Sequence, residues 1–267
     1  MPSYLITGAS RGLGYAWLKH LSSNAQNTVI GLVRDEATAE SRLATDRRTN
    51  VYHVCADITD PKALATAAGQ VRDITGGGLD VLINNAAILT PTSAFKPITD
   101  LSPEVLERDI LHSCRTNVVG VAHTVNAFLP LIRRGRAKKV ITISSLLADP
   151  DLVTHFALDN ATPYAISKSA ANLLMAKYHA SLGATEGILF MALSPGAVSK
   201  PDAAPPTEGE AEGRRRMVAK LKAYAPHFSG PMTMEKSVRR QLEVIENATV
   251  GTHGGAFVSH LGNKQWL

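Results

Sequence analysis

The sequence has few cysteines and no long apolar run. Its 267 residues include two cysteines, Cys55 and Cys114, whose spacing fits no disulfide framework. No run of about 18 apolar residues is present, so no transmembrane helix is expected. The first strand-like run begins at Ser3, which leaves no room for a signal peptide. These absences predict reduced thiols in a cytoplasmic protein that has no membrane partner.

Two further absences bear on metals and nucleic acids. None of the nine histidines forms an H-x-H or H-x-x-x-H pair, so no metal site is expected. The net charge is +5, and basic residues cluster at 133–139 and 214–216, but no aromatic residues interleave with either cluster. The first cluster falls at an expected helix end, where cations favourably meet the helix dipole. Both clusters are therefore interpreted as solvated faces, with no nucleic-acid partner.

What the sequence does contain is a regular alternation of strand-like and helix-like runs. The chain is 45% hydrophobic and 19% charged, as a globular protein with a large core would be. Strands are expected at 3–7, 28–33, 51–55, 80–84, 139–144, 188–193 and 255–259, and helices near 12–23, 61–73, 103–134, 162–182 and 233–247. The alternation predicts an α/β fold, a parallel sheet covered by helices on both faces, in a single domain spanning 1–267. Ligands of such sheets bind at the carboxyl ends of the strands.

A glycine-rich turn follows the first expected strand. Gly8, Gly12 and Gly14 lie between the strand 3–7 and a helix with apolar residues on one face. Glycines allow the backbone to approach a pyrophosphate, and the N-terminus of the helix attracts phosphates. The spacing is G-x-x-x-G-x-G, and an ordinary tight connection is the alternative interpretation. Its place directly after a first strand favours a dinucleotide site.

The residue after the second expected strand is Arg34. A fold that binds NAD would have Asp or Glu there for the ribose hydroxyls, whereas a guanidinium suits the 2′-phosphate of NADP. Arg11, within the glycine-rich turn, could join it, and Asp35 next to it argues the other way. We therefore expect NADP(H) as the cofactor, with an ordinary solvated charge at Arg34 as the alternative.

Tyr164 and Lys168 are four residues apart in an expected helix and so share one face. An ammonium beside a phenol favours the phenolate, which would allow the tyrosine to exchange a proton nearer neutral pH than its usual pKa of about 10. The alternative for an isolated Y-x-x-x-K match is a surface lysine beside a half-buried tyrosine.

The ordered set of motifs resembles the short-chain dehydrogenase/reductase family. The motifs are Thr7-Gly8-x-x-x-Gly12-x-Gly14, Asn84-Asn85-Ala86-Ala87, Asn117, Ser145, Tyr164-x-x-x-Lys168 and Pro195-Gly196. The run Val33-Arg34-Asp35 is similar to the C-factor/sniffer-like carbonyl reductases of that family. The resemblance implies one doubly wound Rossmann domain with a seven-stranded parallel sheet in the order 3-2-1-4-5-6-7. It also implies that members pair through their long helices, as homodimers or homotetramers.

The resemblance assigns a role to each motif. Tyr164 would be the general acid during reduction, and Lys168 would bind the nicotinamide ribose and lower the pKa of Tyr164. Ser145 would hydrogen-bond the substrate carbonyl, and Asn117 would hold a water linking Lys168 to solvent. The residues expected to contact the cofactor are Gly8, Ser10, Arg11, Gly12, Leu13, Gly14, Arg34, Asp57, Ile58, Asn84, Asn85, Ala86, Tyr164, Lys168, Pro195, Gly196 and Val198.

These roles also make chemical sense without the family. A carbonyl that accepts hydride needs hydroxyl donors aimed at its oxygen, and one of them must release a proton. Alternatives remain for single residues: Ser144 and Ser145 could cap the preceding strand, and Asn117 could be a helix-interior residue bonded to backbone. The stretch from Ser145 to Tyr164 is longer than usual for the family, so either Ser144 or Ser145 could be the carbonyl donor.

The stretch 197–231 interrupts the alternation and is interpreted as a substrate lid. Its proline-rich and acidic first part predicts a mobile loop, followed by a short helix near 214–224. Its candidate pocket residues are Met217, Leu221, Tyr224 and Phe228, and the alternative is a surface helix that packs its own apolar face.

Together these features predict an NADPH-dependent reductase of a ketone or aldehyde in a bulky hydrophobic small molecule. One alternative uses the same fold as a non-redox cyclase, isomerase or dehydratase in a biosynthetic pathway. The other is a non-catalytic NADP-binding sensor, against which the complete set Asn117, Ser145, Tyr164 and Lys168 argues.

Overall fold

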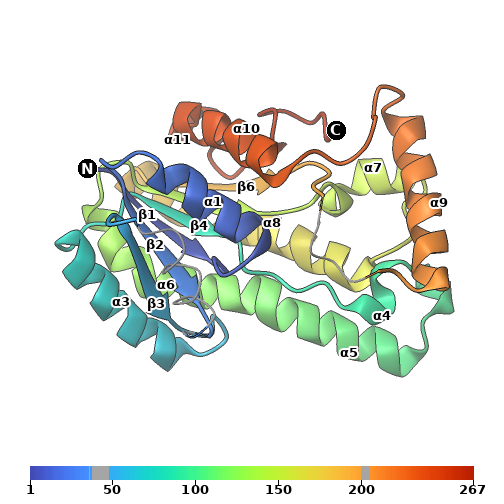
Figure 1. Ribbon diagram of the computed structural model, residues 1–267, viewed down its shortest axis with the longest axis horizontal. Helices are drawn as coiled ribbons and strands as arrows, with labels where there is room; N and C mark the ends of the chain where they lie inside the picture. Colours follow the sequence, from blue (N-terminus) through green and yellow to red (C-terminus); the bar gives the residue numbers. More distant parts are fainter. Residues whose placement is uncertain (36, 38–47, 200–204) are drawn as a thin grey trace.

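The computed structural model describes residues 1–35, 37, 48–199 and 205–267. Within these ranges seven strands form one parallel sheet in the order β3-β2-β1-β4-β5-β6-β7 (Figure 1), which confirms the expected topology. The strands are β1 (Ser3–Thr7), β2 (Thr28–Val33), β3 (Val51–Cys55), β4 (Val81–Asn84), β5 (Lys139–Ile143), β6 (Leu189–Ser194) and β7 (Phe257–Ser259). The first three strands have the predicted bounds, because each is a short run rich in apolar or β-branched residues.

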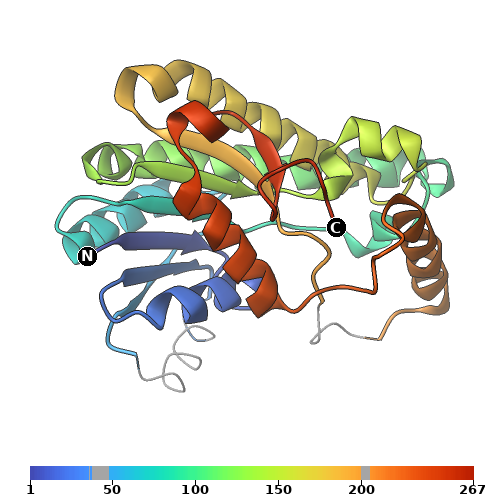
Figure 2. The same ribbon diagram turned by 90° about the horizontal axis from the view of Figure 1, so that it is seen from above.

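Helices cover both faces of the sheet (Figures 1 and 2). One face packs against α1 (Gly12–Ser22) and α10 (Met234–Asn247), and the other against α3 (Pro61–Thr75), α6 (Val121–Arg134) and α8 (Thr162–Glu186). The remaining helical segments are α4 (Pro91–Ala94), η1 (Ile98–Asp100), α5 (Pro103–Cys114), η2 (Arg115–Gly120), η3 (Leu146–Ala148), α7 (Pro150–His155), α9 (Glu208–Tyr224) and α11 (Val250–His253). When both faces of a sheet are covered, the side chains on both sides of each strand are buried. Strand β6 is accordingly buried along its whole length.

The long helix expected at 103–134 is divided into three parts. Helix α5 ends at Cys114, residues 115–120 form the π-helical turn η2, and α6 begins at Val121. A π-helical turn widens the helix locally, and such turns are frequent at functional sites. The buried residues of this turn are Asn117 and Gly120, and the sequence pattern alone did not reveal it.

Two segments expected to be irregular contain helices. The stretch 146–160 holds η3 and α7, and Asp149 caps α7 by accepting a hydrogen bond from the Leu152 amide. Helix α9 begins at Glu208, earlier than the expected start near Arg214, because Thr207 and Glu210 form a capping box. The acidic residues interpreted as part of a mobile loop are therefore its first turn, and residues 200–204 lie outside the described part of the chain.

Candidate functional site

The glycine-rich turn and the segment after β4 lie against each other at the carboxyl edge of the sheet. Thr7 Oγ1 accepts hydrogen bonds from the amides of Asn85 (3.0 Å) and Ala86 (2.9 Å). The Asn85 side-chain amide donates to the Thr7 carbonyl oxygen at 2.9 Å. The last residue of β1 thus holds both motifs together. The side-chain amide of Asn85 is used in hydrogen bonds to the backbone of the turn. A cofactor would therefore contact the backbone of this segment and not the Asn85 side chain.

Glycine is required at two positions of this turn. Gly8 has φ +67°, and a Cβ on it would lie 2.9 Å from Ala86 Cα. A Cβ on Gly14 would lie 2.2 Å from the Gly8 carbonyl oxygen. The first turn of α1, beginning at Gly12, therefore packs directly on the turn before it, and the N-cap residue Arg11 makes no side-chain capping bond to its amides. This arrangement fits a dinucleotide phosphate, as the sequence predicts.

A charged cluster lies beyond the ends of β2 and β3. Asp57 accepts hydrogen bonds at 2.8 Å from both the amide and the hydroxyl of Thr59. Burial acts to raise the pKa of the Asp57 carboxyl, but these bonds and the charges of Arg34 and Arg115 together hold that pKa below its usual value. The structure thus brings the expected residues Arg34 and Asp57 near each other. It adds Arg115, from η2, which sequence reasoning missed because no local motif surrounds it.

Ser145, Tyr164 and Lys168 meet where β5 and α8 come together. The Ser145 side chain lies close enough to the Tyr164 hydroxyl to lower its pKa, and both side chains are half-buried. Lys168 is 2% exposed, its Nζ donates to the Ile143 carbonyl oxygen at 2.6 Å, and it lies 5.7 Å from the centre of the Tyr164 ring. Two hydroxyls and one cation therefore converge at the carboxyl end of β5.

The pKa of Tyr164 is raised in the structure, whereas Lys168 is expected from the sequence to contribute to lowering it. Burial raises the pKa of Tyr164 to about 12, and the hydrogen bond with Ser145 opposes that rise. Burial also lowers the pKa of Lys168 to about 8. Proximity in sequence suggested a direct charge effect, but the ammonium is directed at the Ile143 carbonyl and desolvation dominates both groups.

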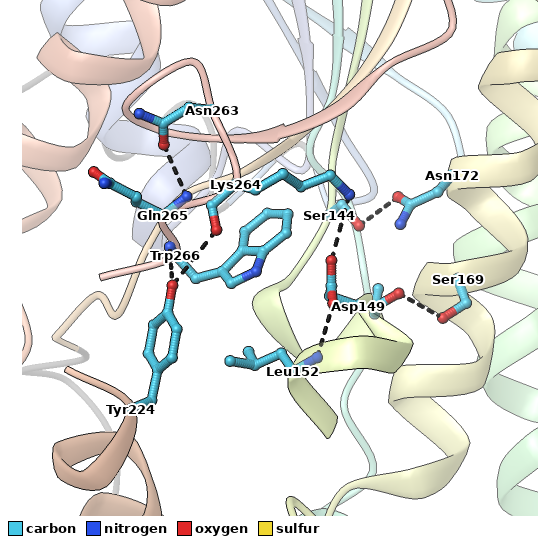
Figure 3. Close-up of polar contacts among 11 residues, drawn as sticks. Ser144, Asp149, Leu152, Ser169, Asn172, Tyr224, Asn263, Lys264, Gln265 and Trp266 are labelled. Atoms are coloured by element: carbon cyan, nitrogen blue, oxygen red, sulfur yellow. Dashed lines mark hydrogen bonds and ion pairs between the residues drawn. The ribbon is translucent and has the colours of Figure 1, made fainter. Parts of the chain in front are cut away.

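The two serines have hydroxyls with different partners. Ser144 is buried, and its hydroxyl donates to Asn172 Oδ1 at 2.6 Å, as Figure 3 shows. The Ser145 hydroxyl faces Tyr164 and also accepts from the Leu147 amide at 3.3 Å. Successive residues of an extended chain point to opposite sides, so only one serine can face the tyrosine. In this structure that residue is Ser145.

Asn117 is fully buried in η2 and connects three elements. Its side chain accepts from the Ile88 amide at 2.9 Å and donates to the Ile88 carbonyl oxygen at 3.0 Å. It also donates to Ser167 Oγ at 2.9 Å, and that hydroxyl donates to the Tyr164 carbonyl oxygen. Asn117 therefore fixes the segment after β4 against the helix that carries Tyr164. Ile88 and Ser167 are two further site residues that no sequence motif indicated.

The turn after β6 borders the same edge. Gly196 has φ +77°, and the Pro195 carbonyl oxygen accepts from the Ser237 hydroxyl at 2.7 Å. Val198 forms an isolated parallel β-bridge with Met232, which follows α9 in the chain. The sheet places this turn beside Ser144, whose amide donates to the Leu193 carbonyl oxygen. The turn at Pro195–Gly196, which is expected to contact the nicotinamide, therefore lies next to Ser144 and Ser145.

Helix α9 is docked against the site at several points. Gly213 packs so closely on α4 that a Cβ would lie 2.3 Å from the Phe95 carbonyl oxygen, and the Arg214 guanidinium lies 4.9 Å from the centre of the Phe95 ring. Lys220 forms an ion pair with Asp159 at 2.6 Å. On its inner side α9 joins a third apolar cluster, whose members from α9 and the following turn are Met217, Leu221, Tyr224 and Phe228. The four candidate pocket residues therefore do face one cluster.

Burial of Lys168 predicts a particular pH dependence of stability. Its pKa is about 8 in the folded protein, below the ordinary value of 10.5, so between these values the unfolded chain binds more protons than the folded one. The contribution of Lys168 to the free energy of unfolding therefore rises with pH through this window. The measured quantity is the free energy of unfolding of Lys168→Met minus that of the original protein. We expect this difference to be roughly 2 kcal/mol more positive at pH 7.5 than at pH 10.

Urea unfolding at a series of pH values measures this difference. Lys177→Met, which removes an exposed lysine of the same helix, is the control and should show a difference that hardly changes with pH. A pH-independent difference for Lys168→Met as well would mean that the ammonium is not desolvated in the folded protein.

Neither a metal site nor a membrane-spanning helix is present in the described part of the chain. In residues 1–35, 37, 48–199 and 205–267, no group of three or more His, Cys, Asp or Glu side chains is arranged to hold a metal ion. In the same ranges, no helix combines the length and the apolar character that crossing a membrane requires.

Comparison with known proteins gives concordant matches. A family model described as short chain dehydrogenase matches residues 3–210. The chain is 87% identical to the short-chain dehydrogenase/reductase AacuF of Aspergillus aculeatus and 44% identical to the short chain dehydrogenase virK of Hypocrea virens, in both cases over 100% of each chain.

Solved structures share the fold. The carbonyl reductase Sniffer of D. melanogaster aligns with a TM-score of 0.77 at 25% identity, covering 98% of both chains. The NADPH-bound carbonyl reductase from chicken fatty liver aligns with a TM-score of 0.76 at 24% identity, also covering 98% of both chains.

Proposed function

This chain belongs to the short chain dehydrogenase family, and from that premise we propose that it is an NADPH-dependent reductase of a ketone or aldehyde in a bulky hydrophobic small molecule. The observation that carries the proposal is the convergence of Ser145, Tyr164 and Lys168, with the Ser145 side chain beside the Tyr164 hydroxyl and Lys168 one helical turn further on. The carbonyl reductases among the solved structures support the reaction class.

The residues that would hold the cofactor lie along the carboxyl edge of the sheet. The amides of the glycine-rich turn and of the first turn of α1 would bind the pyrophosphate. Asp57 and the backbone of residues 84–86 would border the adenosine, and the turn at Pro195–Gly196 would lie against the nicotinamide. The close packing of Gly14 on Gly8 supports this, because a side chain at Gly14 would meet the Gly8 carbonyl oxygen and push the first turn of α1 away from the glycine-rich turn.

The preference for NADP(H) would come from the cations near Asp57. Arg34 is exposed at the end of β2, and Arg115 joins it in lowering the pKa of the Asp57 carboxyl. Guanidinium groups bind phosphate through paired charge-assisted hydrogen bonds. A 2′-phosphate would therefore find two cations here, and the bound NADPH in the chicken protein supports the same choice.

The chemistry expected of the chain itself is polarisation and protonation of a carbonyl oxygen. The hydroxyls of Ser145 and Tyr164 would both donate to that oxygen as negative charge develops on it. Tyr164 would then give up its proton as general acid, a role that a hydroxyl with a pKa near 12 fills in its protonated form at neutral pH. Bound NADPH supplies the hydride.

Lys168 and Asn117 would support the proton donor. Lys168 would bind the nicotinamide ribose, and its charge would stabilise the phenolate that Tyr164 becomes. Asn117 keeps the Tyr164 helix in register with the segment after β4 through Ser167 and Ile88. We propose that a water held near Asn117 links Lys168 to solvent, so that the lost proton is replaced.

The hydrophobic substrate is inferred from the surroundings of Ser145. Leu146 and Leu147 follow it directly and belong to the third apolar cluster, together with Met217 and Tyr224 of α9. An apolar ring system placed against these side chains would gain about 25 cal/mol for each Å² removed from water. We propose that residues 197–231 form the lid over this substrate.

The test is an assay of NADPH consumption with a panel of hydrophobic ketones and aldehydes. We expect the near-ultraviolet absorbance of NADPH to fall in step with formation of the corresponding alcohol. Formation of a rearranged or dehydrated product without net consumption of NADPH would instead indicate a cyclase, isomerase or dehydratase. Binding of NADPH without turnover of any carbonyl would favour a sensor.

A further inference from the structure

The last residues of the chain are bound to the end of helix α9. Tyr224, the last residue of α9, accepts a hydrogen bond from the Trp266 amide at 2.9 Å, and its hydroxyl lies 3.5 Å from the Lys264 carbonyl oxygen. Figure 3 shows both contacts made by the one phenol. The indole of Trp266 is 3% exposed and stacks on the Phe257 ring at 4.5 Å. The segment 264–266 is thus fixed both to the sheet and to the lid.

The same segment is bound to the stretch that follows Ser145. Lys264 Nζ lies 3.4 Å from Asp149 Oδ2, and the other oxygen of that buried carboxylate accepts the hydrogen bond that caps α7 (Figure 3). The ammonium of Lys264 also lies 5.2 Å and 5.3 Å from the ring centres of Phe257 and Trp266. A carboxylate and two ring faces therefore determine where this cation sits.

The stretch after Ser145 is fixed from its other side by the helix that carries Tyr164. Ser169, one residue after Lys168, donates to the Ala148 carbonyl oxygen at 3.0 Å. Leu146, directly after Ser145, packs in the same cluster as Leu221 of α9 and Trp266. A displacement of α9 or of segment 264–266 would therefore act on the residue next to Ser145.

From these contacts we propose that Tyr224 and Lys264 are positioning residues that set the distance between the lid and Ser145 and thereby decide how large a carbonyl substrate is accepted. The inference rests on the proposed reductase function. Neither residue touches the reacting atoms: Tyr224 acts through Trp266 and Leu221, and Lys264 acts through Asp149. A large substrate must fit between α9 and Ser145, whereas a small one contacts Ser145 and Tyr164 alone.

The test uses two variants and two ketones of different size. Tyr224→Phe keeps the ring that packs edge-on against Phe156 at 5.2 Å and removes only the hydroxyl, while Lys264→Met removes the charge and keeps the chain length. The probes are acetone and 2-tetralone, each with saturating NADPH. In both variants we expect KM for 2-tetralone to change by about 5-fold relative to KM for acetone, the size expected for loss of one hydrogen bond.

Tyr178→Phe is the matched control. It also removes a hydrogen-bonded phenol, since Tyr178 of α8 donates to Asn126 Oδ1 at 2.8 Å, but its partners lie on α6. Its ratio of the two KM values should equal that of the original protein. Equal changes in KM for both ketones in Tyr224→Phe and Lys264→Met, or no change, would overturn the proposal.

Hydrogen exchange separates this proposal from the proposed function. In Tyr224→Phe, amides of α7 as well as those of α9 should exchange faster by about 5-fold, because the lost bond joins α9 to segment 264–266, whose Lys264 contacts the Asp149 cap of α7. Exchange unchanged in α7 overturns the coupling whether or not the protein reduces either ketone. If the original protein oxidises no NADPH with any carbonyl, the reductase function is contradicted. Hydrogen exchange in Tyr224→Phe still tests whether α9 and α7 are coupled in that case.

Discussion

Replacement of Tyr164 by Phe is expected to lower kcat for carbonyl reduction by about 10³-fold or more. The substitution removes a proton donor, which contributes about 10²–10⁴-fold, and one of the two hydroxyls expected to stabilise the developing oxyanion. The ring remains and the backbone of α8 is unaffected, so the hydrogen bond from Ser167 to the residue 164 carbonyl persists. Steady-state rates of NADPH oxidation with a hydrophobic ketone measure the loss.

Binding of NADPH distinguishes a chemical defect from a folding defect. The pyrophosphate would be held at the glycine-rich turn, on other strands of the sheet, so the Kd of the Tyr164→Phe variant for NADPH should change by less than about 5-fold. Fluorescence titration of the cofactor gives this Kd. Tyr178→Phe on the same helix should keep full activity. Turnover by Tyr164→Phe at the original rate would exclude Tyr164 as the acid.

Replacement of Arg34 by Asp is expected to reverse the choice of cofactor. A guanidinium–phosphate pair is worth about 1.5–3 kcal/mol, and an aspartate in its place repels the 2′-phosphate while offering hydrogen bonds to the ribose hydroxyls of NADH. We expect the Kd for NADPH to rise about 100-fold and the Kd for NADH to fall or stay constant. The remaining cation, Arg115, limits the loss, since it faces the same Asp57.

A matched charge reversal provides the control for Arg34. Arg72 is an exposed arginine in the last turn of α3, a helix that runs back along the sheet and ends at the edge opposite the glycine-rich turn. Arg72→Asp changes the net charge equally and should leave the ratio of the two dissociation constants unchanged. A similar shift in both variants would show that overall charge, rather than a bond from Arg34, determines cofactor affinity.

The expected strands and most helices could be found from sequence because their signals are local. Most strands are short runs rich in apolar residues, as 3–7 before Gly8 shows. The π-helical turn η2 was missed because no local motif marks it, and its buried residues are Asn117 and Gly120. The early start of α9 was missed because its capping box, Thr207 and Glu210, lies in a stretch whose prolines and acidic residues predicted a loop.

Within the site, the chain order of the motifs was sufficient to predict the family, whereas their contacts were not predictable. Sequence could not choose between Ser144 and Ser145. That choice depends on the bond between Ser144 and Asn172, which are 28 residues apart. The approach of Arg115 to Asp57 likewise depends on where η2 lies against β3.

The sequence by itself determined the α/β alternation and the family, because these follow from local periodicity and from motifs in a fixed order, and it predicts the residues around which a dinucleotide and a carbonyl would bind. Only the tertiary structure decided which hydroxyl faces Tyr164, why the pKa values of Tyr164 and Lys168 are dominated by burial, and how segment 264–266 joins α9 to the stretch after Ser145. The physical reason is distance along the chain: Lys264 and Asp149 are 115 residues apart, and their contact exists only once the sheet and its helices have packed.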